Sequence, residues 1–195
     1  MVEFGERLIS RVLKQVPYRQ WVFSLPKRLR IYFLFNRKLL AKLSRCTWKV
    51  LNIYLRQGAD NADAMPGAAV AIHTFGDFQQ FNPHLHIIAT DGCFAGTGTF
   101  TLSPDAKTPD AKTQDLEELF RYEVLKMLKA EGKITDAIIE NMMSWHHSGF
   151  NVYCVQTLWP DNEEGLENLA RYIIRASFSQ ERMTYIQDDA KVVYQ

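Results

Sequence analysis

The residues from Val70 to Gly92 read VAIHTFGDFQQFNPHLHIIATDG and hold three of the five histidines in the chain. His84 and His86 follow the turn pair Asn82-Pro83 and lead into the apolar residues 87–89, a pattern typical of the start of a β-strand. Side chains alternate along a strand, so both imidazoles lie on the same face of it. Two protonated rings side by side would repel each other, and the pair therefore favours neutral imidazoles directed at a cation.

A third histidine, His73, lies in another apolar stretch, 68–75, upstream of this pair. A hairpin through residues 76–83 would bring it alongside, and we predict a metal site made of His73, His84 and His86. Imidazole nitrogen suits zinc, manganese, nickel or iron better than magnesium, which prefers oxygen ligands. The alternative is that these histidines are ordinary solvent-facing residues of a strand.

The composition is that of a globular protein, with 195 residues, 47% apolar and 23% charged. This length predicts one domain, or one domain with an appendage. No apolar run approaches the length needed to span a bilayer, and residues 1–11 lack the apolar core of a secretory signal. The three cysteines form no C-x-x-C pair, so we expect free thiols and a cytoplasmic location.

A net charge of +1 conceals a strong division along the chain. Residues 1–56 carry thirteen lysines and arginines against two acidic residues, whereas residues 57–195 carry ten against twenty. Aromatic residues are interleaved with the basic ones in the first part, which suits a polyanion whose bases can stack. The alternative is a basic helix face that pairs with the acidic remainder of the same domain.

Periodicity and turn residues predict an alternation of helices and strands. We expect a helix over 1–15 that ends before Pro17, a short helix or turn over 27–35, a helix from an Asn36 N-cap to about 57, and helices over 114–130, 135–143 and 160–174. Strands are expected over 20–25 and 68–75, in the histidine-pair segment to 91, at an edge over 94–102, over 151–158 and, last, over 191–194. We expect a linker over 58–67 and a loop over 103–113.

This order predicts an α+β fold, an antiparallel sheet of the ferredoxin-like, split βαβ type with helices packed on it. On the histidine-pair strand Asp91 has the opposite parity to the histidines. We therefore expect Asp91 to face away from the metal and interpret Asp91-Gly92 as a turn. The chain has no Ser-His-Asp pattern, Gly-rich phosphate loop or paired-acid helix, so ATP-driven and acyl-transfer chemistry lack support.

Several blocks of the chain resemble a known family. The segment FNPHLHIIATDG is similar to the histidine-hydrophobe-histidine (HUH) motif of HUH endonucleases, and the wider pattern resembles two-tyrosine, rolling-circle insertion-sequence transposases. Three further blocks fit the same family in the right order: VPYRQWVFSLPKRLR, SWHHSGFNVY and LARYIIRASFSQERMTY. The resemblance extends over nearly the whole chain and implies the HUH endonuclease-like core, with the paired histidines on a central strand.

The resemblance also implies an activity. It matches Tyr172 to the catalytic tyrosine, which would attack a phosphate of single-stranded DNA and leave a 5′-phosphotyrosine and a free 3′-hydroxyl. A divalent ion, Mg²⁺ or Mn²⁺, would polarise the phosphate. Single-stranded DNA at the ends of a mobile element is the expected partner. The candidate DNA contacts are Arg171, Arg175, Asn168, Lys42, Arg45 and Lys49.

The sequence departs from the two-tyrosine pattern at the expected second nucleophile. Asn168 stands four residues before Tyr172 and Ala176 four residues after it, and Tyr185 is too distant to share the helix face. Single-tyrosine chemistry is therefore expected. Gln79, Gln80 and Asn168 are the alternatives to His73 as third ligand. His146-His147 are expected to be loop residues, because adjacent side chains point in different directions.

We expect residues 1–195 to form a single HUH endonuclease-like domain with a basic N-terminal portion, 1–57. The cysteine-rich zinc-binding segment that often precedes this part in the family has no counterpart, and we expect truncation at both ends. Three alternatives stay open: a replication initiator or relaxase with the same chemistry, a non-catalytic single-stranded nucleic-acid-binding domain, and a histidine-ligated metal hydrolase of small molecules.

Overall fold

A four-stranded antiparallel sheet organises the computed structural model, which describes residues 7–57, 59, 62–76, 80–96, 98–104, 113–173 and 183–194. The strands are β1 (Tyr18–Ser24), β2 (Ala68–Phe75), β3 (Phe81–Thr90) and β6 (Asn151–Cys154). They lie in the order β2-β3-β1-β6, so β3 is inserted between β1 and β2, and β1 between β3 and β6. Two interlocked split βαβ units result, and the predicted fold class is confirmed.

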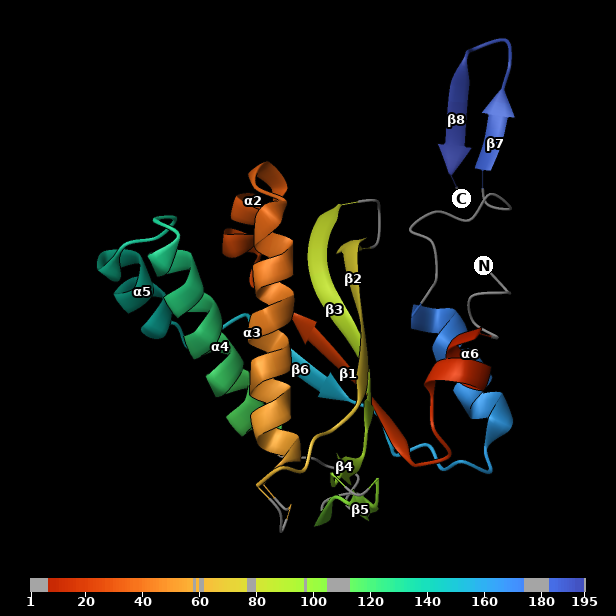
Figure 1. Ribbon diagram of the computed structural model, residues 1–195. Helices are drawn as coiled ribbons and strands as arrows, with labels where there is room; N and C mark the ends of the chain where they lie inside the picture. The colour runs from red at the N-terminus through yellow and green to blue at the C-terminus, as the bar shows by residue number, and fades with distance from the viewer. Residues whose placement is uncertain are drawn as a thin grey trace.

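Helices cover the two faces of this sheet unequally (Figure 1). On one face lie α2 (Lys27–Phe35), α3 (Lys38–Leu55), α4 (Thr113–Ala130) and α5 (Asp136–Met143). On the other face lies α6 (Glu163–Ile173), together with the short π-helical turn η1 (Leu8–Val12). Among the helices that the structure describes, none is long and apolar enough to cross a membrane.

The main hydrophobic core lies between the sheet and α2–α5. Its sheet side consists of odd-numbered residues of β1 and β3, among them Trp21, Phe23, Leu85 and Ile87, none of which is exposed to solvent. The even-numbered residues of both strands therefore point to the opposite face, where α6 lies. One face of the sheet supplies stability, and the other is available for a site.

A smaller apolar cluster fixes α6 on the second face. Leu166, Leu169, Ala170 and Ile173 recur at helical spacing and pack with Ile88 of β3. These side chains are buried, whereas the opposite side of α6 is exposed. The rotation of the helix about its axis is thereby determined, and with it the direction of every polar residue that the helix carries.

Several predicted elements differ from the observed ones. Of the predicted helix over 1–15, the structure describes residues from 7 onwards. The helical turn η1 ends at Val12, because the backbone of Leu13 is already extended. Asn36 does not cap α3: Arg37 precedes the helix, without a side-chain hydrogen bond. The predicted strand over 151–158 ends at Cys154 and returns only as a bridge at Leu158.

The predicted edge strand over 94–102 is a hairpin of β4 (Gly92–Phe94) and β5 (Phe100–Leu102). Gly98 has φ +85° and donates to the Ala95 carbonyl, so the alternating glycines form a turn rather than continue a strand. At Gly92 a Cβ would lie 2.2 Å from the Thr101 carbonyl oxygen, so only glycine fits there. A second hairpin joins β7 (Met183–Ile186), which was not predicted, to the predicted last strand β8 (Lys191–Tyr194).

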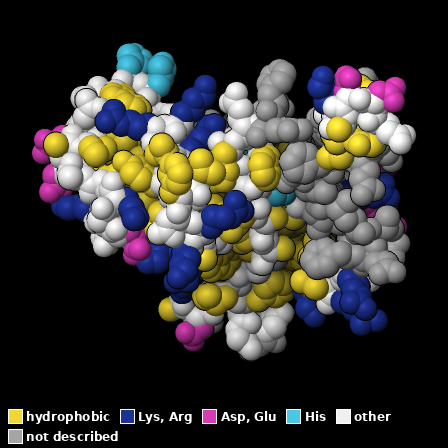
Figure 2. All heavy atoms as spheres, turned by 90° about the horizontal axis from the view of Figure 1, so that it is seen from above, with side chains coloured by type: hydrophobic (Ala, Val, Ile, Leu, Met, Phe, Trp, Pro, Cys, Tyr) yellow, Lys and Arg dark blue, Asp and Glu magenta, His cyan; other side chains and the backbone are white. Residues whose placement is uncertain are grey.

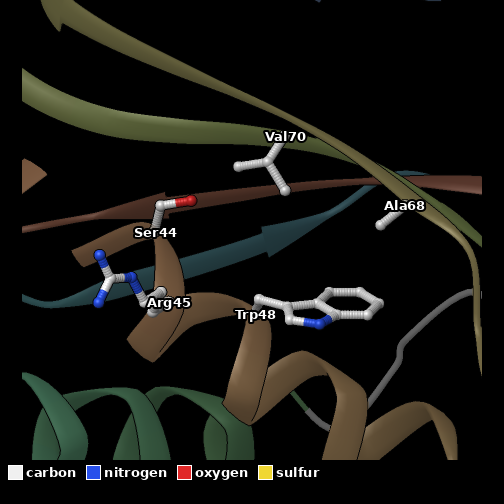
Figure 3. Close-up of a pocket in the computed structure, with 5 residues that line it drawn as sticks. All are labelled: Ser44, Arg45, Trp48, Ala68 and Val70. Carbon is white, nitrogen blue, oxygen red and sulfur yellow. The ribbon is translucent and has the colours of Figure 1, made fainter. Parts of the chain in front are cut away.

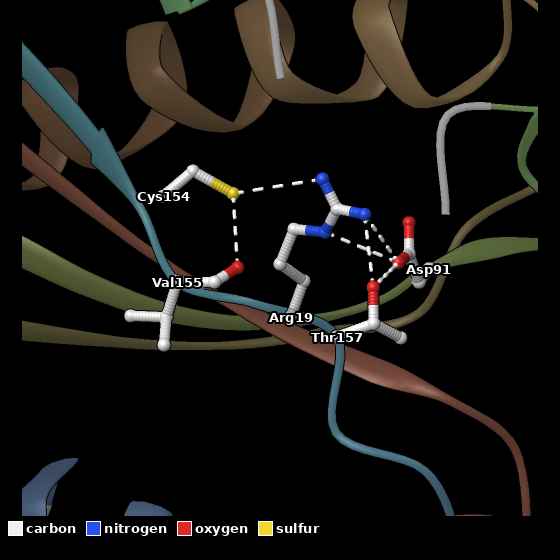
Figure 4. A network of polar contacts seen from close by, with 5 residues as sticks. All are labelled: Arg19, Asp91, Cys154, Val155 and Thr157. Carbon is white, nitrogen blue, oxygen red and sulfur yellow. Dashed lines mark hydrogen bonds and ion pairs between the residues drawn. The ribbon is translucent and has the colours of Figure 1, made fainter. Parts of the chain in front are cut away.

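A buried ion pair joins the ends of three strands on the face of the sheet that α2–α5 cover (Figure 4). Arg19 donates through Nε and Nη2 to Oδ2 of Asp91, at 3.1 and 2.8 Å, and both side chains are almost fully buried. The Thr157 hydroxyl donates to the same oxygen, and burial raises the pKa of the neighbouring Cys154 thiol to about 12. Asp91 thus faces away from the histidines, as predicted, and holds the bend between β3 and β4.

Removing the charge of Asp91 is expected to destabilise the fold strongly. In Asp91→Asn the Arg19 guanidinium stays buried without a counter-charge, which costs about 3–5 kcal/mol. Urea denaturation followed by circular dichroism measures the free energy of unfolding. The control is Asp136→Asn, which breaks the exposed pair with Lys129 and should cost less than about 1 kcal/mol. Equal effects of the two substitutions would contradict this role of the ion pair.

Candidate active site

Three histidine rings converge on the face of the sheet opposite the main core. In the pairing of β2 with β3, His73 lies directly opposite His84, and His86 lies two residues further along β3. The ring centroids are 5.5 Å apart for His73 and His84, 4.5 Å for His73 and His86, and 4.9 Å for His84 and His86. One nitrogen from each ring lies within 4.8 Å of the others, a spacing that could hold one metal ion.

Each ring makes a polar contact that bears on which nitrogen is free. Nδ1 of His84 lies 2.7 Å from the Asn82 carbonyl oxygen and donates to it, which leaves Nε2 with its lone pair. Nε2 of His73 lies 2.9 Å from the carbonyl oxygen of Ile173, in the last turn of α6. Nδ1 of His86 lies 3.3 Å from the side-chain amide of Gln20. The amide nitrogen of Gln20 is the atom nearest to Nδ1. With the amide group rotated by half a turn, its oxygen accepts a hydrogen bond from Nδ1, and Nε2 of His86 is free for a metal.

The surroundings keep at least two of the rings neutral. Burial lowers the pKa of His86 to about 4, and the neighbouring His73 and His84 add to this effect. The pKa of His84 is also lowered, chiefly by burial. Neutral imidazole is the form that ligates a metal, so neither ring needs to lose a proton near pH 7. Three nitrogen donors fit manganese or zinc better than magnesium.

Tyr172 lies at the edge of the histidine cluster. Its ring centroid is 5.0 Å from that of His86, and the two rings meet edge to face at 83°. The side chain is 46% exposed, because its neighbours Leu169 and Ile173 turn the buried side of α6 towards the sheet. The structure therefore brings the exposed phenol of Tyr172 on α6 next to three histidines that could hold a metal ion.

Most of the chain matches the model of a known protein family. The family model described as "Putative transposase", that of the two-tyrosine transposases, matches residues 67–195, more than half of the chain. The chain belongs to the two-tyrosine family of HUH transposases. Comparisons with curated proteins and with solved structures return no match. Membership of the transposase family places the chain in DNA transposition and makes DNA its partner.

The predicted DNA contacts on α6 lie beside the tyrosine of this transposase domain. Arg171 is exposed and forms an ion pair with Glu167 one turn earlier, at 3.0 Å. Asn168 is exposed and lies one helical turn before Tyr172. Arg175 and the alternative ligand Gln79 lie outside the described residues. Gln80 is described and exposed.

The predicted contacts on α3 lie on the opposite side of the sheet from the histidines (Figure 1). Lys42 pairs with Glu131, and Lys49 pairs with Glu123 at 2.7 Å, so the acidic residues that follow α3 in the chain neutralise both. Arg45 lines a pocket of about 300 Å³ between α3 and β2 (Figure 3). These side chains do not converge on the cluster, and the two ion pairs favour the alternative of a basic helix face that is paired within the domain.

Two residues near the cluster were not singled out from the sequence. Arg30 of α2 donates to the Leu25 carbonyl, and its charge adds a small contribution, after burial, to the lowered pKa of His84. Gln20 contacts His86 from the neighbouring strand. Local patterns carried no signal for either, because both positions depend on how α2 and β1 pack beside β3. Figure 2, which views the molecule from above, shows Lys and Arg side chains among hydrophobic ones.

The two adjacent histidines of the transposase chain, His146 and His147, lie in the loop between α5 and β6, as predicted. Both are exposed, and their ring centroids are 4.5 Å apart. They are not grouped with a third metal-binding side chain among the described residues. They therefore offer a matched control for substitutions in the histidine cluster.

Metal affinity is expected to depend on the three rings and on Gln20. Titration calorimetry with Mn²⁺ should show one site in the wild-type protein and loss of binding in His84→Asn, with His147→Asn unchanged. Gln20→Ala should weaken binding by about 10- to 100-fold, the usual effect of an outer-shell partner, and Gln20→Glu should restore it. Unchanged Mn²⁺ binding in His84→Asn would contradict the assignment of the site.

Stability is expected to fall on acidification of the metal-free protein. The folded state keeps His86 neutral down to about pH 4, whereas an unfolded histidine takes up a proton near pH 6.5. Between these values the unfolded state binds more protons, so the free energy of unfolding decreases as the pH is lowered. Urea titrations in EDTA should give a shallower pH slope for His86→Asn than for wild type or His147→Asn. An identical slope in all three proteins would contradict the neutral buried state.

Proposed function

We propose that the chain nicks and rejoins single-stranded DNA during transposition through a covalent bond between Tyr172 and DNA. The observation that carries the proposal is the 5.0 Å separation between the rings of Tyr172 and His86. A nucleophile beside a metal-binding cluster is the arrangement that phosphoryl transfer needs, since the nucleophile and the group that stabilises charge must reach the same phosphorus. Membership of the two-tyrosine transposase family supports the same assignment.

In this proposal His73, His84 and His86 hold a divalent ion, Mn²⁺ or Mg²⁺. When bound, the ion supplies Lewis-acid polarisation of the phosphate. Arg30 of α2 is proposed to stabilise negative charge on the same phosphate, since its charge acts on His84. Gln20 orients His86 through Nδ1.

The chemical step is a transesterification. The Oη atom of Tyr172 forms a bond to phosphorus, and the bond from phosphorus to the 3′ oxygen breaks. The phenol loses its proton and the departing 3′ oxygen takes one up, so no net proton or electron is consumed. The 5′-phosphotyrosine ester conserves the energy of the broken bond, and attack by a 3′-hydroxyl of another strand reverses the step. No further cofactor is required.

We propose a single nucleophile rather than a pair. Asn168 occupies the position one turn before Tyr172, and its amide has no nucleophilic oxygen that could form a phosphoester. Tyr185, the next tyrosine of the chain, belongs to β7 in the separate C-terminal hairpin. Asn168, Arg171 and Arg175 are proposed to contact the DNA on either side of the cut. The chain, 1–195, is proposed to act as one nuclease domain.

The test is the formation of a protein–DNA adduct that survives denaturation. The protein is incubated with Mn²⁺ and a pool of random-sequence single-stranded DNA that carries a fluorescent label at the 3′ end. A 5′-phosphotyrosine leaves the label on the protein, whereas a 5′ label leaves with the released fragment. The labelled band should appear with Mn²⁺, disappear with EDTA, and fall by at least about 1,000-fold in Tyr172→Phe, which lacks the nucleophile.

Tyr122→Phe on α4 is the matched control and should form the adduct as wild type does. DNA binding without an adduct in any protein would support the non-catalytic alternative. An adduct that persists in Tyr172→Phe would contradict the assignment of the nucleophile.

A further inference from the structure

Among the described residues, α6 and η1 cover only part of the sheet face that carries the histidines. The apolar residues of α6 pack on Ile88, Ala69 and Ala71 of β3 and β2. The other two strands, β1 and β6, continue the same face beyond the histidines. Val22 of β1 lies directly between His86 and Tyr153 in the strand register, and Ser24 lies between His84 and Asn151. Two cross-strand rows therefore lead from the histidine cluster to the edge strand β6.

Tyr153 points out of this face. Its neighbour Val152 is buried in the main core on the helix side, so Tyr153 has the opposite direction. The tyrosine is 59% exposed although it stands in a strand of the central sheet. It is two strand spacings, about 10 Å, from His86 along the row.

The open rows match the chemistry of a nucleotide. The proposed metal site lies at one end of the rows, at His73, His84 and His86. The positions between them and Tyr153 carry the small side chains of Val22 and Ser24, and no carboxylate occurs in either row. A phosphate bound at the cluster would thus place the attached base over an uncharged strip that ends at an aromatic ring.

We propose that Tyr153 is a stacking platform for the base next to the cut phosphate. The inference rests on the proposed function, since the cluster must bind the phosphate first. An exposed aromatic ring on a β-sheet binds an unpaired base through its π face, independently of sequence. In duplex DNA the bases are stacked on one another and cannot reach the ring, so the platform selects single strands.

The experiment compares two short oligonucleotides with the same number of phosphates. One is single-stranded DNA of about six mixed-sequence nucleotides, and the other has the same backbone with every base removed. Both carry fluorescein, and binding is measured by anisotropy with Mn²⁺ in a Tyr172→Phe background, which prevents covalent capture. The ratio of the two dissociation constants isolates the contribution of the bases from that of the phosphates.

The background protein is expected to prefer the base-bearing strand. Tyr153→Ala should weaken binding of that strand by roughly 5- to 150-fold, the range for loss of one base–aromatic stack, and should leave the abasic strand within about two-fold. Tyr153→Phe should keep the preference, because stacking needs the ring and not the hydroxyl. Tyr122→Ala is the matched control, since Tyr122 is also 59% exposed but lies on α4.

Equal binding of the base-bearing strand by Tyr153→Ala and its parent would overturn the inference. So would equal weakening of both strands, which would indicate a general disturbance of the sheet, and thermal unfolding of each variant separates that case. If instead the proposed function is wrong, no Tyr172-dependent adduct forms. If that adduct forms while the base preference does not depend on Tyr153, only the stacking platform is wrong.

Discussion

The antiparallel register between β2 and β3 is the constraint on which the site depends. It places His73 directly opposite His84 and leaves His86 on the same face. Because side chains alternate, a slip of one residue would turn the histidines of one strand into the main core and its apolar residues to the surface. The large apolar residues of β3, Leu85 and Ile87, fix which face of the strand is buried, so a one-residue slip is excluded and the histidines stay on the opposite face.

The register changes between His73 and Phe75, where the pairing is irregular. Irregularities of this kind end regular pairing and bend a strand, and they are common beside active sites. The strict pairing thus ends next to the histidine cluster. Tyr172 depends on a second constraint, the apolar stripe of α6, which the carbonyl of Ile173 reinforces by its contact with His73. Tyr172 and the three histidines are thus linked by packing and by one hydrogen bond.

The histidine pair and the split βαβ order could be predicted because each rests on local alternation and on the order of elements. His73 could be predicted because a hairpin through residues 76–83 would bring it beside the pair. Gln20, Arg30 and Tyr153 could not be connected with the site in this way, because their positions depend on pairing between segments far apart in the chain. Charge counting was also insufficient: the basic residues Lys42 and Lys49 are neutralised by acidic residues that follow in the chain. The hairpin over 92–102 was missed because alternating glycines resemble a strand until a positive φ turns the chain.

In the proposed site, one metal ion is held by three imidazoles beside Tyr172. The most direct measurement is anomalous X-ray diffraction from crystals grown with Mn²⁺. We expect a single strong peak bonded to one nitrogen each of His73, His84 and His86, at roughly the 2.0–2.2 Å of metal–ligand bonds, with the Tyr172 hydroxyl facing the open side of the ion. A peak elsewhere, or a metal-free cluster at saturating Mn²⁺, would contradict it.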